Sequence, residues 1–418
     1  MKTRESKQTS GADPGYFYGH VVVAAAFFIM VVMWAAYYSF GIYFKPMINE
    51  FGWTRAITSG AFSLSSIVNG LLAIVMGRLT DAYGPRIVMT ICAVMLCLGF
   101  LLMSQIGAVW QLYIFYGVIA GTGMGGSFVP LLSTVARWFV AKRSLMTGIV
   151  TAGIGIGALA GPPLSNLLIT VYGWRTAFVV TGSVILAAVV LSARLVQRDP
   201  SQMGMSAYGS DKAEHPAARL PSTALSLGEA MVTAPFRIVF AMYFCLGFCV
   251  FTIMVHMAPH ARELGFSASG AANVLATVGG LSIAGRVALG RAADSLGSRR
   301  TFVIGFALMS AALLGLIPAK HIWQLYSVAG VFGLAFGGCA ASQSPLAAEL
   351  FGLRAHGAIL GVLSFGFTVG GGAGPFLSGY IFDVTDSYRL AFLMCLGISM
   401  VGLIFTLFLK PGSVKRQR

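Results

Sequence analysis

The residue with the clearest chemical meaning is Arg286, in the apolar stretch "GGLSIAGRVALG". It stands five residues before Arg291, so about 7–8 Å of helix separates it from the next charged residue. An arginine within a membrane-spanning helix costs about 2.5–3.5 kcal/mol on insertion, so it is expected to face a cavity. Its planar fork offers a carboxylate two parallel hydrogen bonds. Arg286 therefore predicts an anion site, with snorkelling to lipid headgroups as the alternative.

Acidic residues are absent from the deep parts of the apolar stretches. Those closest to them, at their ends, are Asp81, Asp294, Glu349 and Asp383. A cation carrier normally needs a buried carboxylate, whereas an unpaired buried arginine suits an anion. The distribution of charge therefore favours an anionic ligand.

Other side chains in apolar stretches are candidates for the same site. Ser282 lies one helical turn before Arg286 and on the same face. Hydroxyl and amide groups could donate to a substrate oxygen, and phenylalanines could wall a short acyl chain. These candidates are Tyr37, Tyr38, Gln343, Ser364, Phe332, Phe336, Phe365 and Phe367. For each of them, ordinary hydrogen bonding or packing between helices is the alternative.

His256, in "FTIMVHMAPH", lies about one turn inside the end of its apolar stretch. A histidine there can exchange a proton near physiological pH, which makes it a candidate for proton coupling. The alternative is an interfacial histidine without a role in coupling.

Two patterns suggest other chemistry and are set aside. The glycines of "GTGMGG" at 121–126 match a dinucleotide fingerprint, but they lie inside an apolar span with no acidic residue about 20 positions later. They more plausibly permit close helix packing. Cys245 and Cys249 are one turn apart, but without a nearby histidine or carboxylate they predict packing and no metal site.

The composition identifies the elements that must hold these residues. Of 418 residues, 57% are hydrophobic and 10% are charged, and the mean hydropathy is +0.82. A soluble domain carries about 25% charged residues, so this chain is expected to be a membrane protein. The first seventeen residues are polar and the following apolar run is too long for a signal peptide, so none is predicted.

A membrane-spanning helix needs about 20 predominantly apolar residues. That rule predicts twelve spans in two groups of six. The first group is 18–44, 56–77, 87–105, 110–136, 144–170 and 175–196, and the second is 236–260, 268–290, 301–318, 322–348, 357–381 and 388–410.

The two groups are copies of one another. The residues Gly77, Arg78, Asp81, Gly84 and Arg86 recur 213 positions later as Gly290, Arg291, Asp294, Gly297 and Arg299. "WQLY" at 110–113 and "GP" at 161–162 recur with the same offset. Because six helices return the chain to its starting side, the halves are parallel repeats about an axis along the membrane normal.

Lysine and arginine placement gives the orientation. With the N-terminus inside, 20 of the 28 basic residues fall in cytoplasmic segments, so both termini are expected in the cytoplasm. The predicted organisation is a tail at 1–17, a bundle at 18–196, a cytoplasmic linker at 197–235, a bundle at 236–410 and a tail at 411–418. The net charge of +15 is therefore explained by basic residues on the cytoplasmic side of the membrane, and we expect no nucleic-acid partner.

The repeated charged cluster is placed in the tight inner loop between the second and third helix of each half. Basic residues alone would satisfy anchoring at the inner surface, but an aspartate in both copies would not. The aspartates can meet arginines or helix N-termini and hold the inner side shut. The predicted cytoplasmic gate comprises Arg78, Asp81, Arg86, Arg291, Asp294 and Arg299.

Two six-helix repeats with G-R-x-x-D-x-x-G-x-R in both inner loops resemble the major facilitator superfamily, over nearly the whole chain. Within it, "ARWFVAKRSLMTGIVTAGIGIG" at 136–157 resembles the fifth-helix signature of the monocarboxylate transporter family and its relative, the oxalate–formate antiporter. "FGIYFKPMINEFGWTRA" at 40–56 resembles the first external loop of bacterial members. The fold implied is all-α, with twelve transmembrane helices in two pseudo-symmetric bundles.

The resemblance assigns the family's substrate-binding arginine to Arg286 and a hydroxyl donor to Tyr116. Animal monocarboxylate transporters have a lysine where Tyr38 aligns. The oxalate–formate antiporter has a second basic residue in helix eleven, and none stands in that segment here. One arginine neutralises one carboxylate, so a monocarboxylate is favoured over a dianion.

The sequence therefore predicts a secondary active transporter of a lactate- or pyruvate-like monocarboxylate across the cell (inner) membrane. Alternating access with proton symport is expected, and the alternative is an exchanger or exporter for dicarboxylates, aromatic acids or other small solutes. No P-loop is present. Neither an enzyme nor a sensor is expected, since no catalytic constellation and no sizeable soluble domain are evident. We expect no cofactor or metal, a monomer in the lipid bilayer, and a small organic anion and protons as partners.

Overall fold

The computed structural model describes residues 17–210 and 224–409 of the 418. The predicted tails at 1–17, apart from Phe17, and 411–418 lie outside the described residues, as do residues 211–223 of the predicted linker.

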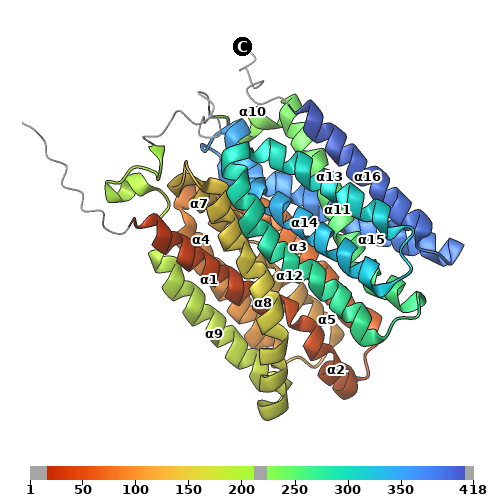
Figure 1. The fold of residues 1–418 in the computed structure, drawn as a ribbon. Coiled ribbons are helices and arrows are strands. Elements are labelled where there is room, and N and C mark those ends of the chain that lie inside the picture. Colours follow the sequence, from red (N-terminus) through yellow and green to blue (C-terminus); the bar gives the residue numbers. More distant parts are fainter. Residues whose placement is uncertain (1–16, 211–223, 410–418) are drawn as a thin grey trace, which may run out of the picture.

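Long helices make up nearly all of the described chain (Figure 1). Those of the first half are α1 (Gly19–Tyr38), α2 (Phe40–Phe51), α3 (Arg55–Tyr83), α4 (Pro85–Met103), α5 (Val109–Leu112), the π-helix η1 (Tyr113–Ala120), α6 (Gly121–Met124), α7 (Val129–Trp138), α8 (Arg143–Tyr172) and α9 (Trp174–Leu195). Those that follow are η2 (Pro200–Met203), α10 (Leu227–Met231), α11 (Ala234–Glu263), α12 (Ala268–Leu296), α13 (Ser298–Leu316), α14 (Ile322–Phe351), α15 (His356–Thr385) and α16 (Arg389–Phe408).

Within the described residues, twelve helical segments are long and apolar enough to cross a membrane. One span combines α1 with the start of α2, and another runs from α5 through α7. This confirms the predicted twelve-span, all-α membrane protein. The second of these composite spans contains the π-helix η1, and such widened turns are frequent at functional sites.

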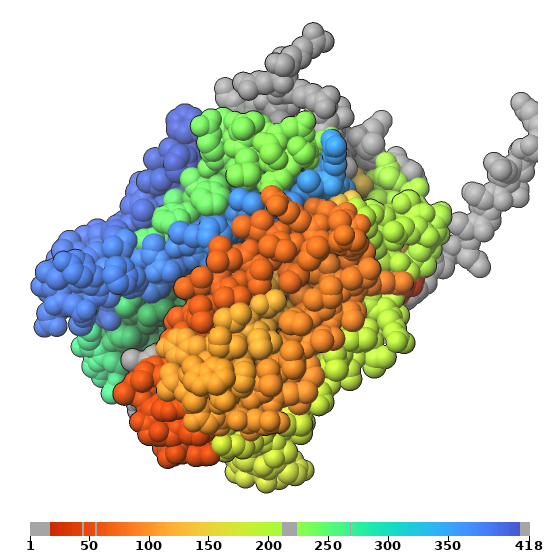
Figure 2. All heavy atoms as spheres, turned by 180° about the vertical axis from the view of Figure 1, so that it is seen from behind, coloured from red at the N-terminus to blue at the C-terminus, as the bar shows by residue number. Residues whose placement is uncertain are grey.

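The two groups of six helices meet along two seams. In one seam α8 lies against α12, and Figure 1 shows these helices side by side between the two groups. In the other seam α3 lies against α15, where orange and blue atoms meet in the view from behind (Figure 2). Each seam therefore joins one helix of the first half to one of the second.

The repeated charged clusters lie mainly in helices and not in loops as predicted. Helix α3 continues through Arg78 and Asp81 to Tyr83, and α12 continues through its copy of the cluster to Leu296. The hydropathy rule ended each span where charge began, but backbone hydrogen bonding continues because nothing before Gly84 or Gly297 breaks the helix. The turns are single glycines, Gly84 at φ 85° and Gly297 at φ 88°, in a region disfavoured for other residues.

The repeat extends to details of the backbone. Thr54 caps the start of α3 and Ser267 caps α12, each through a side-chain oxygen that accepts from the helix backbone. These capping residues are 213 positions apart, as are the turn glycines at 84 and 297. The end of the bundle at which Gly84 and Gly297 lie is called the motif end below.

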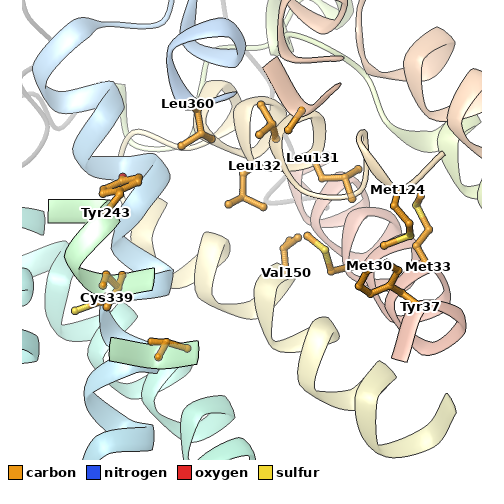
Figure 3. Close-up of a cluster of buried hydrophobic side chains, with 14 of the residues drawn as sticks. Met30, Met33, Tyr37, Met124, Leu131, Leu132, Val150, Tyr243, Cys339 and Leu360 are labelled. Atoms are coloured by element: carbon orange, nitrogen blue, oxygen red, sulfur yellow. The ribbon is translucent and has the colours of Figure 1, made fainter. Parts of the chain in front are cut away.

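Buried apolar side chains fill both halves. Figure 3 shows Met30, Met33, Tyr37 and Met124 grouped on one side, with Tyr243 and Cys339 on the other. Leu131, Leu132 and Val150 lie between these groups. The core is therefore continuous across the molecule and includes residues that face the seams.

Helices α12 and α14 owe their close contact to glycine. A methyl group added at Gly337 would overlap the Ser282 carbonyl oxygen, and one at Gly333 would lie 2.5 Å from the Val278 carbonyl oxygen. Gly280, on α12 itself, has open space where a side chain would begin. The backbone approach therefore depends on particular glycines and not on glycine content as such.

We predict that Gly337→Ala lowers the thermal stability of the purified protein, because its methyl group must push two backbones apart at a cost of about 1–3 kcal/mol. Gly280→Ala is the matched control and is expected to be neutral or stabilising, since alanine is favoured over glycine in a helix by about 0.5–1 kcal/mol. Thermal unfolding in one detergent measures both. Equal stability of the two variants would contradict the proposed packing.

Candidate substrate site

Arg286 lies in the seam between the two halves. Its side chain is 4% exposed, and its Nη1 donates a 2.8 Å hydrogen bond to the backbone carbonyl of Thr151 on α8. Gly148 allows this approach, because a methyl group there would overlap the Arg286 carbonyl oxygen. The arginine of one half is thus bound to the backbone of the other and does not reach outward along its own helix.

One edge of the guanidinium group remains available. Its Nε is buried without a hydrogen-bond partner among the described residues. A buried donor without a partner is costly, about 1–3 kcal/mol and more when charged. Because Nη1 is engaged by Thr151, the edge formed by Nε and Nη2 is the one that a carboxylate can bind through two parallel hydrogen bonds.

The surroundings of Arg286 are aromatic. The guanidinium carbon lies 5.4 Å from the centre of the Phe336 ring, within cation–π distance. Tyr38, the last residue of α1, lies within electrostatic range of Arg286, and its side chain is 42% exposed although it lies within a membrane span. Arg286, Phe336 and Tyr38 therefore come together from three helices, two from one half and one from the other.

The other two predicted tyrosines lie inside the first half. Tyr37 is buried and its hydroxyl group is 2.6 Å from the Ser66 hydroxyl group on α3. Tyr116 is 1% exposed and stacks on Phe40 with 3.8 Å between ring centres. The Tyr116 hydroxyl group has no partner among the described residues. Of the three predicted tyrosines, Tyr38 therefore interacts electrostatically with Arg286, whereas Tyr37 and Tyr116 pack within the first half.

The remaining polar candidates differ in their freedom to bind a ligand. The Ser282 hydroxyl group donates to the Gly279 carbonyl of its own helix at 2.7 Å. Gln343 is buried, and its backbone carbonyl accepts from the Tyr243 hydroxyl group at 2.6 Å. The Ser364 hydroxyl group is buried without a partner in the described chain, and Phe365 is half-buried on the same helix.

His256 is buried within the second half. Its Nε2 lies 3.0 Å from the Pro375 carbonyl, which can only accept, so Nε2 carries a proton. Its Nδ1 lies 3.3 Å from the Tyr388 hydroxyl group. Burial raises the pKa of Tyr388, with the Glu263 and Asp383 carboxylates adding to the effect, so this hydroxyl group keeps its proton. His256 is thus hydrogen-bonded between α11, α15 and the start of α16, and the Tyr388 hydroxyl group can either donate to Nδ1 or accept from it.

At the motif end, each repeated aspartate caps a helix of the opposite half. Asp81 on α3 accepts from the backbone N–H groups of Gly357 and Ala358 at 3.2 and 2.9 Å. Asp294 on α12 accepts from those of Ser144 and Leu145 at 2.7 and 3.1 Å. These pairs begin α15 and α8, where the helix dipole favours a negative charge. Every residue of one set is 213 positions from its counterpart.

The arginines of the repeated cluster do not bridge the halves. Arg86 donates to the carbonyls of Arg194 and Val196, and Arg299 to those of Thr406 and Leu407, so each binds the last helix of its own half. Arg78 and Arg291 are exposed. The aspartates alone, among the six predicted gate residues, therefore form cross-half hydrogen bonds in the described chain.

Sequence reasoning missed two contributors to these contacts. Arg137 joins the halves at the motif end, since it pairs with Asp81 at 3.1 Å and donates to the Leu353 carbonyl at 2.7 Å. The Thr151 carbonyl that binds Arg286 is a backbone group and leaves no trace in residue types. The 213-residue offset could have indicated the two caps. The predicted helix starts at 144 and 357 are equivalent positions in the repeat, and so are the two aspartates that bind there.

Similarity to known proteins identifies the family of this chain as well as its fold. The family described as Major Facilitator Superfamily matches residues 26–291 and, in a second match, 239–418. The chain belongs to the major facilitator superfamily. The two overlapping matches together cover nearly all of the sequence, including both copies of the charged cluster.

Relatives with established names lie in one branch of that superfamily. Monocarboxylate transporter 13 of Rattus norvegicus is 28% identical over 400 residues, covering 94% of this chain and 89% of its own. The oxalate:formate antiporter of Oxalobacter formigenes is 26% identical over 394 residues, covering 92% and 90%. These relatives confirm the predicted resemblance to the monocarboxylate and oxalate–formate branch.

Solved structures agree on the fold. The proton:xylose symporter XylE superposes with a TM-score of 0.75 at 13% identity, over 94% of this chain and 96% of its own. The human organic anion transporter MFSD10 gives 0.70 at 15% identity, over 93% and 99%. These two structures show the fold, and together with the family match and the named relatives they identify the chain as a multi-pass membrane transporter of this superfamily and not an enzyme.

We predict that Asp81→Asn opens the motif end. The substitution keeps the size of the side chain but removes the charge that interacts with the α15 N-terminus, worth about 1–2 kcal/mol and so roughly 5–30-fold in population. Spin labels on Tyr83→Cys and Arg354→Cys, both exposed and in opposite halves, report the separation, and the described native cysteines are all buried. A longer distance is expected in Asp81→Asn.

Asp383→Asn serves as the control, because Asp383 is an exposed acid in α15 near its other end. It should leave the label distance unchanged. If Asp81→Asn also leaves it unchanged, the carboxylate caps do not hold the halves together.

Proposed function

We propose that this transporter carries a small organic monocarboxylate, lactate- or pyruvate-like, with Arg286 as the anchor for the carboxylate group. The observation that carries the proposal is the buried guanidinium edge with no partner in the described chain. A single buried arginine with one free edge matches the charge and shape of a single carboxylate. The names of the relatives support an organic anion as cargo.

The apolar side of the site supports a short acyl chain. The Phe336 ring lies against the guanidinium group and closes one side with a non-polar surface. An electrostatic interaction of Tyr38 with Arg286 and the exposure of its side chain support Tyr38 as the hydroxyl donor to a ligand. Tyr38 would therefore donate to a keto or hydroxy oxygen beside the carboxylate, with Gln343 and Ser364 as further polar groups.

The proposed cycle is alternating access, with the halves rocking about the level of Arg286. The distribution of basic residues supports cytoplasmic termini, so we infer that the motif end is the cytoplasmic side. The cross-half hydrogen bonds of Asp81 and Asp294 hold that end closed in the described state. Opening it must break both caps and the Arg286 bond to Thr151.

Proton symport is the proposed coupling, and His256 is the candidate proton carrier. Its neutral form binds both Pro375 and Tyr388, so protonation at Nδ1 requires the Tyr388 hydroxyl group to turn from donor to acceptor. A proton there would thus alter the contacts among α11, α15 and the start of α16.

We predict that Arg286→Gln abolishes saturable monocarboxylate uptake into proteoliposomes. Loss of the charge-assisted pair costs about 2–5 kcal/mol, or roughly 30- to several-thousand-fold in apparent affinity. Arg286→Lys keeps the charge without the fork and should raise KM while retaining some transport. Arg300→Gln, an exposed arginine away from the seam, is the control and should transport normally. Undiminished uptake by a folded Arg286→Gln protein would refute the proposal.

We also predict that an imposed gradient, acidic outside, accelerates uptake by the wild-type protein. In His256→Gln, which keeps a polar side chain but cannot take up a proton, the gradient should lose most of its effect while counterflow of labelled and unlabelled acid persists. Measuring both in the same vesicles separates coupling from binding. Gradient-driven uptake that survives the substitution would exclude His256 as the proton carrier.

A further inference from the structure

The Lys142-Arg143 pair, part of the stretch that resembles the fifth-helix signature, has no role in the substrate site. It lies between α7 and α8 and borders a cavity of about 640 Å³ at the motif end. The opposite wall of this cavity is the last turn of α12, with Arg291 and Asp294, and Glu349 of α14 completes it. The cavity therefore lies in the seam between the halves, and Arg286 is not among its lining residues.

Arg143 is the buried cation in the lining of this cavity. The residue is 3% exposed, and its Nε donates to the carbonyls of Ala136 and Phe139 at 3.1 and 2.8 Å. Its Nη2 is buried and has no hydrogen-bond partner in the described chain. The two carbonyl bonds fix the orientation of the guanidinium group, so the positive charge of Arg143 has a fixed position beside the cavity.

Two exposed basic residues add to the same cavity. Lys142 sits in a left-handed conformation at φ 59° with its ammonium group 5.3 Å from the centre of the Tyr208 ring. Arg291 projects from the last turns of α12. Neither forms an ion pair with the described residues, so both side chains are available to an anion.

The two acids of the cavity are already engaged. Asp294 accepts the backbone N–H groups that begin α8, and Glu349 accepts from the Ser298 hydroxyl group at 2.6 Å. With three cations and two anions, the lining keeps an excess of positive charge. The acids thus bind backbone and hydroxyl donors and also lie within electrostatic range of Arg143, whereas Lys142 and Arg291 form no ion pair with the described residues.

We propose that this cavity binds a phosphate group, carried either by a lipid headgroup or by a soluble phosphate. Its volume is within the usual range for small-molecule sites, about 300–1,000 Å³. Arginine binds phosphate through its fork and lysine binds it as a point charge. Because the lining comes from both α8 and α12, a bound phosphate group joins the two halves and favours the state in which the motif end is closed.

The test uses the purified full chain at low ionic strength and two probes. In the first arm, inorganic phosphate is titrated against chloride of matched ionic strength while the melting temperature is recorded. In the second, the protein is reconstituted in phosphatidylcholine vesicles with or without roughly one fifth phosphatidylglycerol, chosen for its anionic phosphodiester group. A rise in melting temperature in the first arm identifies a soluble phosphate, and a rise confined to the second identifies a lipid headgroup.

The variant is Lys142→Asn with Arg291→Gln, which leaves the buried Arg143 intact. Asparagine tolerates the left-handed conformation of residue 142, so the loop is preserved. The control, Arg300→Gln with Arg354→Gln, removes two exposed charges that do not line the cavity. The half-saturating probe concentration should rise at least about tenfold in the variant and stay unchanged in the control.

Two results would overturn the proposal. One is the absence of stabilisation of the wild-type protein in both arms. The other is equal stabilisation of the wild-type protein and the Lys142→Asn/Arg291→Gln variant, which would show that any anion effect arises elsewhere on the basic surface. Both results are independent of which acid the protein transports.

Discussion

Burying one arginine in an apolar bundle is the constraint on which the central part of the structure depends. Two interactions offset part of the cost of burying this charge. Arg286 Nη1 donates a hydrogen bond to a backbone carbonyl of the opposite half, and the guanidinium group lies over the Phe336 ring. Glycines at the seam make that carbonyl reachable, since a side chain at Gly148 would keep the helices apart. What is left unsatisfied, the Nε edge, is what an anionic cargo can satisfy.

Arg286 and the motif end share one feature, a charged side chain of one half bound to backbone groups of the other. Arg286 binds a carbonyl, whereas Asp81 and Asp294 bind helix N-termini. Backbone groups cannot move without their helix, so these bonds report the positions of whole helices. This explains how a local event at the site can be linked to movement of the two halves.

Much of the fold could be predicted from the sequence, because membrane helices are recognised by their length and hydropathy and the 213-residue offset revealed the repeat. The charged clusters were misplaced into loops, since hydropathy ends where charge begins but α3 and α12 continue. Arg286 was identified because a lone charge among apolar residues is conspicuous. The electrostatic interaction of Arg286 with Tyr38, and not with Tyr116, depends on the orientation of each helix about its own axis. Residue types alone do not determine that orientation.

The repeat is imperfect at one place that bears on movement. Arg137 reinforces the cap of α15, but the equivalent position in the second half is Leu350, and the corresponding seam holds the cavity beside Arg143. At the motif end the two seams thus differ in ion pairing: Arg137 pairs with Asp81 in one, whereas the cations that line the cavity in the other form no salt bridge with the described residues. We expect the halves to separate first between α8 and α12, while the contact between α3 and α15 is kept. The opening motion is then an asymmetric rotation about the α3–α15 contact.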